Sequence, residues 1–168
     1  MRRTHKISDT PVLAVSGVKN SGKTTLLTGL IPLLKERGLK VAAVKHDGHD
    51  FSPDVPGTDS FRLRQAGAAA VGVYSARRYF FTAEEAVTAE DLIGLCEGVD
   101  LVLLEGGKMS PLPKIEIVRA AVSLKPVSDP GTLVALCTDT SLALPGIPSL
   151  GLGDYPALAG LIVRHFNF

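Results

Sequence analysis

Short apolar runs alternate with helical patterns of leucine along the chain, and glycine, proline or polar residues bound each run. A buried strand reads as a continuous apolar run, whereas a helix repeats its apolar positions every three or four residues. The runs predict strands at residues 11–15, 40–45, 68–74, 79–82, 100–104, 114–118, 132–137 and 147–150. The leucine patterns and their capping residues predict helices at residues 23–37, 58–65, 88–95 and 155–165. This alternation is typical of an α/β fold with a mostly parallel sheet and helices on both faces.

The stretch from residue 68 to residue 82 departs from the alternation, because two apolar runs flank the short polar segment Ser-Ala-Arg-Arg at 75–78. Two strands joined by a short turn form an antiparallel pair, so we expect a β-hairpin extension. No internal repeat or linker divides the chain. We therefore expect one domain over residues 1–168, with residues 1–10 as a flexible N-terminal extension.

Composition narrows the range of partners. The 168 residues carry a formal net charge of +1, and the basic residues are scattered, which gives no electrostatic reason to expect a nucleic acid. Aromatic residues are sparse, which disfavours a stacking platform for bases. No apolar run approaches the roughly 20 residues that span a bilayer, so no membrane segment is expected. Cys96 and Cys137 lie far apart without a C-x-x-C motif, which indicates reduced thiols in a cytoplasmic protein.

Residues 17–24 fill every fixed position of the phosphate-binding loop G-x-x-x-x-G-K-[ST], the Walker A motif. An apolar strand precedes this segment and a helix follows it, so that the first backbone N–H groups and the helix dipole face one anion site. Lys23 would reach the β- and γ-phosphates, and the Thr24 hydroxyl would bind Mg²⁺. The sequence therefore predicts a P-loop fold of three layers that binds a nucleoside triphosphate. The predicted nucleotide-binding residues of the loop are Gly17, Val18, Lys19, Asn20, Ser21, Gly22, Lys23, Thr24 and Thr25.

Acidic residues follow three other predicted strands. The carboxyl ends of parallel strands meet at one edge of a sheet, so we expect Asp47, Glu105 and Asp139 to face the loop. Glu105 directly follows an apolar strand, where nucleoside triphosphatases place the acid that binds Mg²⁺ or orients water; the alternative is a solvated loop carboxylate. Asp47 is a second candidate for the metal or the water. We therefore expect catalysis from Lys23, Glu105 and Asp47, and metal binding by Thr24, Glu105 and Asp47.

Asp139 is the candidate for recognition of the base. Its carboxylate could accept two N–H bonds from the edge of guanine, a pattern that adenine does not offer, and a turn residue within 138–141 is an equal alternative. The same balance holds for His46 and His49, which are either substrate contacts or polar loop residues. The residues alone leave both choices open.

Several segments beyond the loop make the chain recognisable. They are residues 44–49 (VKHDGH), 56–62 (PGTDSFR), 66–68 (AGA), 104–106 (LEG) and 114–115 (KI). With the loop they resemble the molybdopterin-guanine dinucleotide biosynthesis protein B family over nearly the whole chain. The first two segments are more specific than the phosphate loop, which many families share. Gly107 departs from the pattern, since the family carries an aromatic residue after Glu-Gly.

This resemblance implies GTP and Mg²⁺ as cofactors, slow GTP hydrolysis and a homodimer. It also implies a partner, the enzyme that attaches GMP to molybdopterin, and leaves open whether molybdopterin itself is bound. One alternative is a nickel-inserting GTPase, although such proteins carry Cys- or His-rich metal sites and the two cysteines here are isolated. The other is an ATP-dependent small-molecule kinase or ligase of the same fold. A binding module that uses GTP without turnover is also compatible with the residues.

Overall fold

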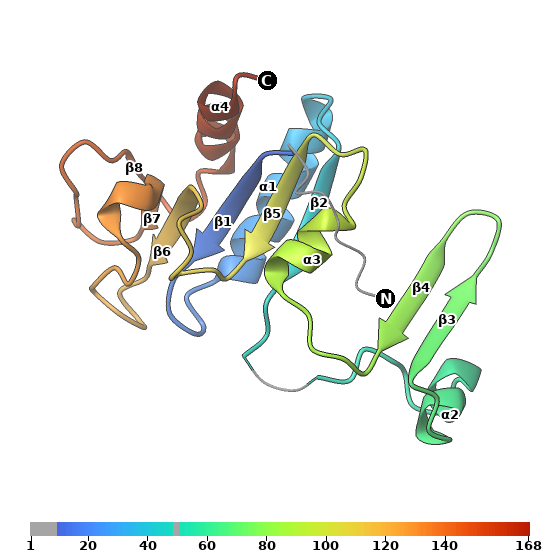
Figure 1. Ribbon diagram of the computed structural model, residues 1–168. Coiled ribbons are helices and arrows are strands. Elements are labelled where there is room, and N and C mark those ends of the chain that lie inside the picture. Colours follow the sequence, from blue (N-terminus) through green and yellow to red (C-terminus); the bar gives the residue numbers. More distant parts are fainter. Residues whose placement is uncertain (1–9, 49–50) are drawn as a thin grey trace. The chain divides into compact units, whose positions relative to one another are not determined.

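The computed structural model describes residues 10–48 and 51–168, and they form two compact units (Figure 1). The first unit runs to His46 and resumes from Ala89 to Phe168, and the second is Asp47–Thr88. The expectation of one domain over the whole chain stays a prediction. The proposed N-terminal extension, except for residue 10, and His49 lie outside the described residues.

The first unit is built on a six-stranded sheet with the order β2-β5-β1-β6-β7-β8 in the described residues (Figure 1). Every ladder in this sheet is parallel. Strands β5 and β6 are buried along their whole length. Burial on both faces explains the continuous apolar run of β5, whereas β6 also buries Lys114 and Glu116. The mostly parallel sheet is therefore confirmed. Its strands are β1 Val12–Ser16, β2 Val41–Lys45, β5 Leu101–Glu105, β6 Lys114–Val118, β7 Leu133–Thr138 and β8 Ser149–Leu150.

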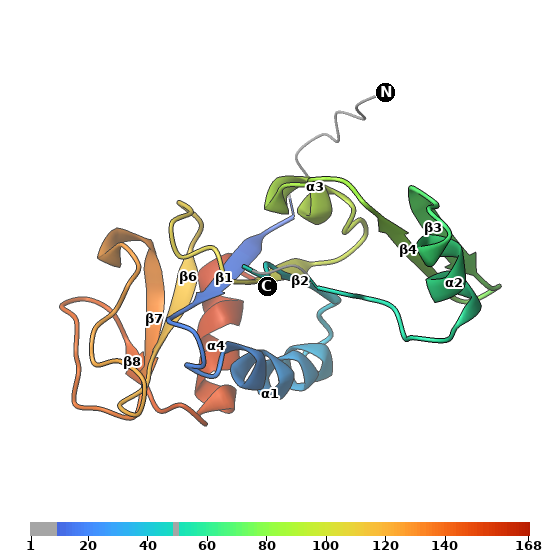
Figure 2. The ribbon, with the colours of Figure 1, turned by 90° about the horizontal axis from the view of Figure 1, so that it is seen from below.

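Helices cover both faces of the sheet (Figure 2). Helices α1 (Lys23–Glu36) and α4 (Tyr155–Phe166) pack on one face, and α3 (Ala89–Gly94) packs on the other. The buried side chains on the α1 and α4 side include Leu13, Val15, Leu27, Leu30, Leu34, Leu103, Ile115 and Ile162. Those on the α3 side are Ala14, Val44, Ile93, Val102 and Leu104. The expected three-layer arrangement is confirmed.

Local signals define the ends of the long helices. Gly38 takes φ 87° just after α1, and the Leu39 N–H donates to the Leu34 carbonyl at 3.1 Å, so the glycine closes the helix as its position predicts. Asp154 begins α4, because its side chain accepts the Ala157 N–H at 3.3 Å. The 3-10 turn η1 (Pro130–Thr132) before β7 has no counterpart among the predicted elements.

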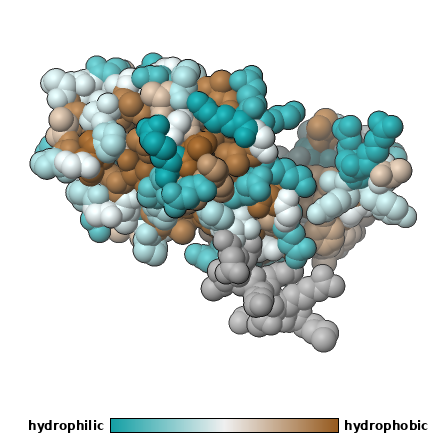
Figure 3. Space-filling view, turned by 90° about the horizontal axis from the view of Figure 1, so that it is seen from above, coloured by the Kyte–Doolittle hydropathy of each residue, from teal (hydrophilic) through white to brown (hydrophobic). Residues whose placement is uncertain are grey.

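The second unit holds α2 (Asp59–Gln65) and the antiparallel pair β3 (Ala70–Tyr74) and β4 (Tyr79–Ala83). The predicted hairpin is confirmed, and its turn is closed by the Ser75 N–H donating to the Arg78 carbonyl at 2.8 Å. Val71 is the one fully buried residue among those described in this unit. Figure 3 shows hydrophobic side chains reaching the surface among polar ones on one face of the protein.

Candidate nucleotide-binding site

The phosphate loop connects β1 to α1 at the carboxyl edge of the sheet, and two glycines give it its shape. Gly17 has φ 136°, and a Cβ built there would lie 2.7 Å from both the Ile117 carbonyl oxygen and Ser21 Oγ. Gly22 has φ 103° and is the N-cap of α1, with no side-chain hydrogen bond to the helix end. Both positions require glycine, and the first N–H groups of α1 remain available to a ligand.

Lys23 folds back over this loop. Its Nζ donates to the carbonyl oxygens of Gly17 at 3.2 Å and Val18 at 2.8 Å. Exchange of these carbonyls for phosphate oxygens would need only a small movement of a flexible side chain. The buried Ser21 hydroxyl makes no hydrogen bond within the described residues, as expected of a polar atom placed to meet a ligand. The loop therefore fits a bound phosphate chain.

The remaining loop residues lie where the motif predicts. Lys19 and Asn20 are exposed, and Asn20 takes the left-handed conformation at φ 64°. Thr25 lies in the first turn of α1 and is exposed. None of these residues makes a contact in the described structure that identifies the nucleotide.

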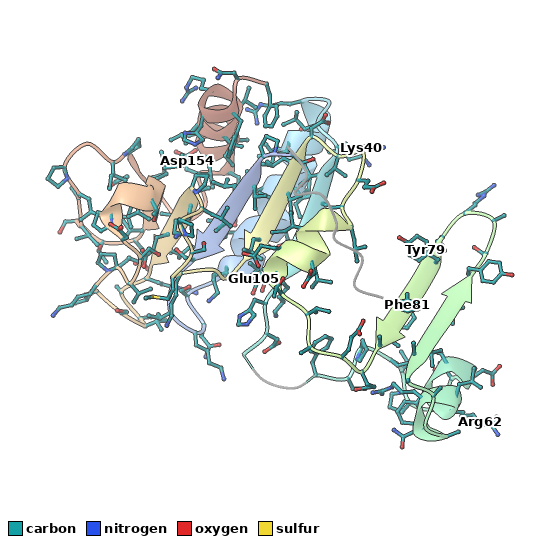
Figure 4. The ribbon with its side chains drawn as sticks, in the orientation of Figure 1. Lys40, Arg62, Tyr79, Phe81, Glu105 and Asp154 are labelled. Carbon is teal, nitrogen blue, oxygen red and sulfur yellow. The ribbon has the colours of Figure 1, made fainter. Side chains whose placement is uncertain are left out.

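Thr24 meets Glu105 at the end of β5, where Figure 4 labels Glu105. The Thr24 hydroxyl lies 3.1 Å and 2.9 Å from the two carboxylate oxygens of Glu105, to which it donates. The Glu105 residue is only 8% exposed, so it is not the solvated loop carboxylate of the alternative interpretation. Two hard oxygen ligands beside a phosphate loop fit Mg²⁺, which prefers carboxylate and hydroxyl oxygens.

Lys45 is a charged residue of this edge that the sequence analysis did not select. It ends β2, pairs in register with Glu105 of β5, and its Nζ lies 3.7 Å from Glu105 Oε1. In the sequence it is the last residue of an apolar strand and part of the 44–49 segment, but neither feature assigns it a role. That position also suits an ordinary solvated lysine, so the pairing of β2 with β5 was needed to find it.

A cavity of about 190 Å³ opens on the opposite side of the loop. Arg119, at the end of β6, and Tyr155, at the start of α4, contribute to its wall, and the Tyr155 ring lies against Gly29 of α1, where a Cβ would come within 2.6 Å of the ring. The volume is below that of a whole ligand site, so it suits one part of a nucleotide. Neither residue was predicted, because their approach depends on the packing of α4 beside α1. The cavity is lined by Ser21, Gly22, Thr25, Leu26, Ile117, Arg119, Leu152, Gly153 and Tyr155.

Asp139 follows β7 at the same edge and is exposed. Its Oδ1 accepts the Ala120 N–H at 2.7 Å, which ties the loop after β6 to the end of β7. This bond supports the turn-residue alternative, and it leaves the second carboxylate oxygen outside that contact. Recognition of guanine by Asp139 stays a prediction.

Two candidate residues directly follow β2, and the structure places His46 beside Glu105. The His46 N–H donates to the Glu105 carbonyl at 3.0 Å, and its Cβ lies near Gly106, so His46 packs beside the acidic strand end. Asp47 begins the second unit, and its part in metal binding or catalysis stays a prediction.

Buried polar residues of β6 anchor the connection that leads to β7. Glu116 accepts the N–H groups of Val127 and Ser128, and Ser128 Oγ lies 2.7 Å from Ser16 Oγ at the end of β1. Lys114 is fully buried and donates to the Ser110 carbonyl at 2.6 Å. Burial lowers the pKa of Lys114, while the charges of Asp129 and Glu116 act in the opposite direction. These contacts fix the loops around the phosphate site without facing it.

Comparison with known proteins decides the family. The model of the molybdopterin guanine dinucleotide synthesis protein B family matches residues 12–139, which include the phosphate loop, Glu105 and Asp139. The chain belongs to this family. Over 163 residues it is 36% identical to the molybdopterin-guanine dinucleotide biosynthesis adapter protein of Escherichia coli, with 92% of each chain covered. The adapter protein of Haemophilus influenzae is 37% identical over 165 residues, covering 94% of this chain and 92% of the relative.

Solved structures of the family agree with the fold. The crystal structure of Bacillus subtilis MobB gives a TM-score of 0.74 at 29% identity and covers 92% of this chain and 96% of its own. The structure of a MobB homologue from Bacillus stearothermophilus gives 0.72 at 24% identity. In the described residues no helix is long and apolar enough to cross a membrane.

Proposed function

We propose that this member of the family binds GTP with Mg²⁺, hydrolyses it slowly, and acts as an adapter for the enzyme that attaches GMP to molybdopterin. The contact of Thr24 with the buried Glu105, next to Lys23, carries the nucleotide part of the proposal. The adapter names of the Escherichia coli and Haemophilus influenzae relatives support the pathway.

The two sides of the loop suggest how the nucleotide lies. Its phosphates would occupy the loop N–H groups and Lys23, and Thr24 and Glu105 would hold Mg²⁺ on the β5 side. Asp47 would complete the metal shell or orient water. The nucleoside would extend toward the cavity beside Arg119 and Tyr155. Bound Mg²⁺ would neutralise charge on the β- and γ-phosphates.

Titration calorimetry with GTP and ATP, each with and without Mg²⁺, tests this part directly. We expect GTP to bind more tightly than ATP and its affinity to rise with Mg²⁺. A preference for ATP would instead favour a kinase or ligase of the same fold. Absence of binding by both nucleotides would overturn the site.

Asp139 is our candidate for guanine recognition. Asp139→Asn keeps the Oδ1 acceptor for the Ala120 N–H and places an amide donor where guanine also donates. We expect GTP affinity to fall more than the affinity for ITP, which lacks the exocyclic amine. Equal losses for both nucleotides would assign Asp139 to the turn alone.

A homodimer would use the hairpin of the second unit. The alternation of β3 and β4 puts Tyr74, Tyr79 and Phe81 on one face, with Tyr74 paired to Tyr79 and Phe81 paired to Gly72, and we call this set the aromatic face. The three residues are 88%, 80% and 65% exposed. Exposed apolar patches of this kind are typical of protein interfaces.

The adapter role needs its own experiment. Adding this protein with GTP and Mg²⁺ to the GMP-transferring enzyme and molybdopterin should raise the yield of the guanine dinucleotide cofactor. Absence of stimulation, together with absence of association between the two proteins at micromolar concentration, would remove the adapter role. The nucleotide site would then stand on the calorimetry alone.

A further inference from the structure

The pairing of Lys45 with Glu105 joins a half-exposed cation to a buried carboxylate. The Lys45 side chain is 55% exposed and that of Glu105 is 10% exposed, at an Nζ–Oε1 distance of 3.7 Å. Glu105 accepts at the same time from Thr24. An ion pair with one exposed partner adds little to stability. The half-exposed Lys45 side chain can therefore turn to another anion at a small cost in stability.

The strand order places Lys45 at a defined end of the nucleotide site. The phosphate loop follows β1, the cavity lies on the β6 and β8 side through Ile117 and Leu152, and Glu105 and Lys45 lie on the β5 and β2 side. A nucleotide whose nucleoside occupies the cavity must run across the loop toward Glu105. Its last phosphate is then the group nearest to Lys45.

The charges at this end change when the metal arrives. Without Mg²⁺, the Glu105 carboxylate attracts the Lys45 ammonium group. Mg²⁺ held by Thr24 and Glu105 would neutralise that carboxylate and would repel the Lys45 ammonium group. The terminal phosphate carries the largest uncompensated negative charge nearby. A flexible lysine can turn toward it without a change in the backbone.

We propose that Lys45 binds the γ-phosphate and so makes the site prefer GTP over GDP. This inference rests on the proposed function, because it requires a guanine nucleotide on the loop. Lys45 leaves Glu105 when Mg²⁺ binds there, and its ammonium group then donates to the terminal phosphate oxygens. Lys23 holds the β-phosphate in either nucleotide, whereas Lys45 contributes only when the third phosphate is present.

Lys40 offers a matched control. It precedes β2 at the end of the strand opposite Lys45, and Figure 4 labels it well apart from Glu105. Its backbone N–H donates to Asp100 Oδ2 at 2.7 Å, a contact that a side-chain change preserves. Lys40→Gln and Lys45→Gln therefore remove the same charge from the two ends of one strand.

The test is titration calorimetry of the full chain in Mg²⁺, using GDP and a GTP analogue with an imido group between the β- and γ-phosphorus atoms. We expect Lys45→Gln to weaken the analogue by about ten- to over a hundredfold, the effect of a lost charge-assisted contact, and to leave GDP within about twofold. Lys45→Arg should recover part of the loss. Lys40→Gln should change neither affinity.

Two results would overturn the inference while the proposed function stands: equal weakening of GDP and the analogue by Lys45→Gln, or no weakening of either, in each case with the parent protein binding both. A parent protein that binds neither nucleotide would overturn the proposed function and the inference with it. Thermal unfolding of Lys45→Gln without nucleotide should match that of the parent. A lowered midpoint would show a structural role and overturn the inference as well.

Discussion

The two units of the chain bury their apolar residues to different extents. In the first unit the sheet is buried between helix layers, and β5 and β6 have no exposed position. In the second unit the described residues bury only Val71 fully, and the aromatic face stays in solvent. Apolar burial is the main favourable term in folding. The first unit therefore buries its own apolar residues, whereas most apolar side chains described in the second unit stay exposed.

Polar contacts hold the second unit in place of a core. Asp54 Oδ1 accepts from the hydroxyls of Thr58 at 3.1 Å and Ser60 at 3.0 Å, which fixes the start of α2. Arg64 pairs with Glu84 at 3.4 Å and links α2 to the end of the hairpin. A two-stranded hairpin is marginally stable without a packed face. These contacts set a shape for the unit and leave its aromatic face available to a partner.

The largest expected effect comes from emptying the core of the first unit. Leu103 is fully buried in β5, and Leu103→Ala should lower the free energy of unfolding by about 2–5 kcal/mol. The control is Leu63→Ala in α2 of the second unit, where the side chain is exposed and the change should stay within about 0.5 kcal/mol. Urea unfolding measures both. Equal losses would contradict the contrast between the units.

The next largest effect is a loss of GTP affinity at the nucleotide site of the first unit. Lys23→Ala removes a charge-assisted contact to phosphate, so GTP binding should weaken by about 1.5–3 kcal/mol, or ten- to over a hundredfold. The free energy of unfolding should change little, because Lys23 bonds only to exposed or half-buried loop carbonyls in the described contacts. Calorimetry with GTP measures the loss. An unchanged GTP affinity would contradict the assignment of the phosphate site.

A smaller effect should follow removal of the aromatic face. Tyr79→Ser with Phe81→Ser takes two exposed rings from β4, and we expect dimer affinity to fall by about 1–2 kcal/mol while GTP affinity stays constant. Sedimentation velocity over a concentration series measures the dissociation. The matched control is Leu95→Ser, which removes an exposed apolar side chain from the first unit. A dimer unaffected by the double substitution would place the interface elsewhere.

Sequence patterns predicted the first unit well because its physics is local and repetitive. Apolar runs marked most strands of the buried sheet. The loop motif located Lys23 and Thr24, and the apolar run that became β5 located Glu105. The sequence did not predict Lys45 and Arg119 as site residues, because their proximity to the site depends on strand order. That order brings β2 beside β5 and β6 beside the cavity. A lysine or arginine at the end of a strand looks the same whether or not a ligand site lies next to it.

In the second unit the sequence predicted the secondary structure but not which side chains are exposed. The turn residues at 75–78 predicted the hairpin correctly, yet the aromatic residues beside them were indistinguishable from core residues. Apolar side chains in a strand are usually read as buried, although much of a protein surface is apolar. The pairing of Tyr74 with Tyr79 puts the two rings on one face, and their exposed surface shows that this face is not part of a core.

The smallest expected effect tests how well the core of the first unit excludes solvent from a buried thiol. Burial raises the pKa of Cys137 in β7 to about 12, and the charge of Asp154 acts in the same direction. The folded thiol then keeps its proton above pH 9 while the unfolded thiol loses it, so the free energy of unfolding falls as pH rises through that range. Between pH 8 and pH 9.5 we expect this group to cost about 1 kcal/mol, a loss that Cys137→Ala removes. Thiol labelling at pH 8 gives an independent measure, since the half-buried Cys96 should react first and Cys137 only on unfolding. Rapid labelling of both thiols in the folded protein would show that the sheet opens to solvent and would contradict the closed core of the first unit.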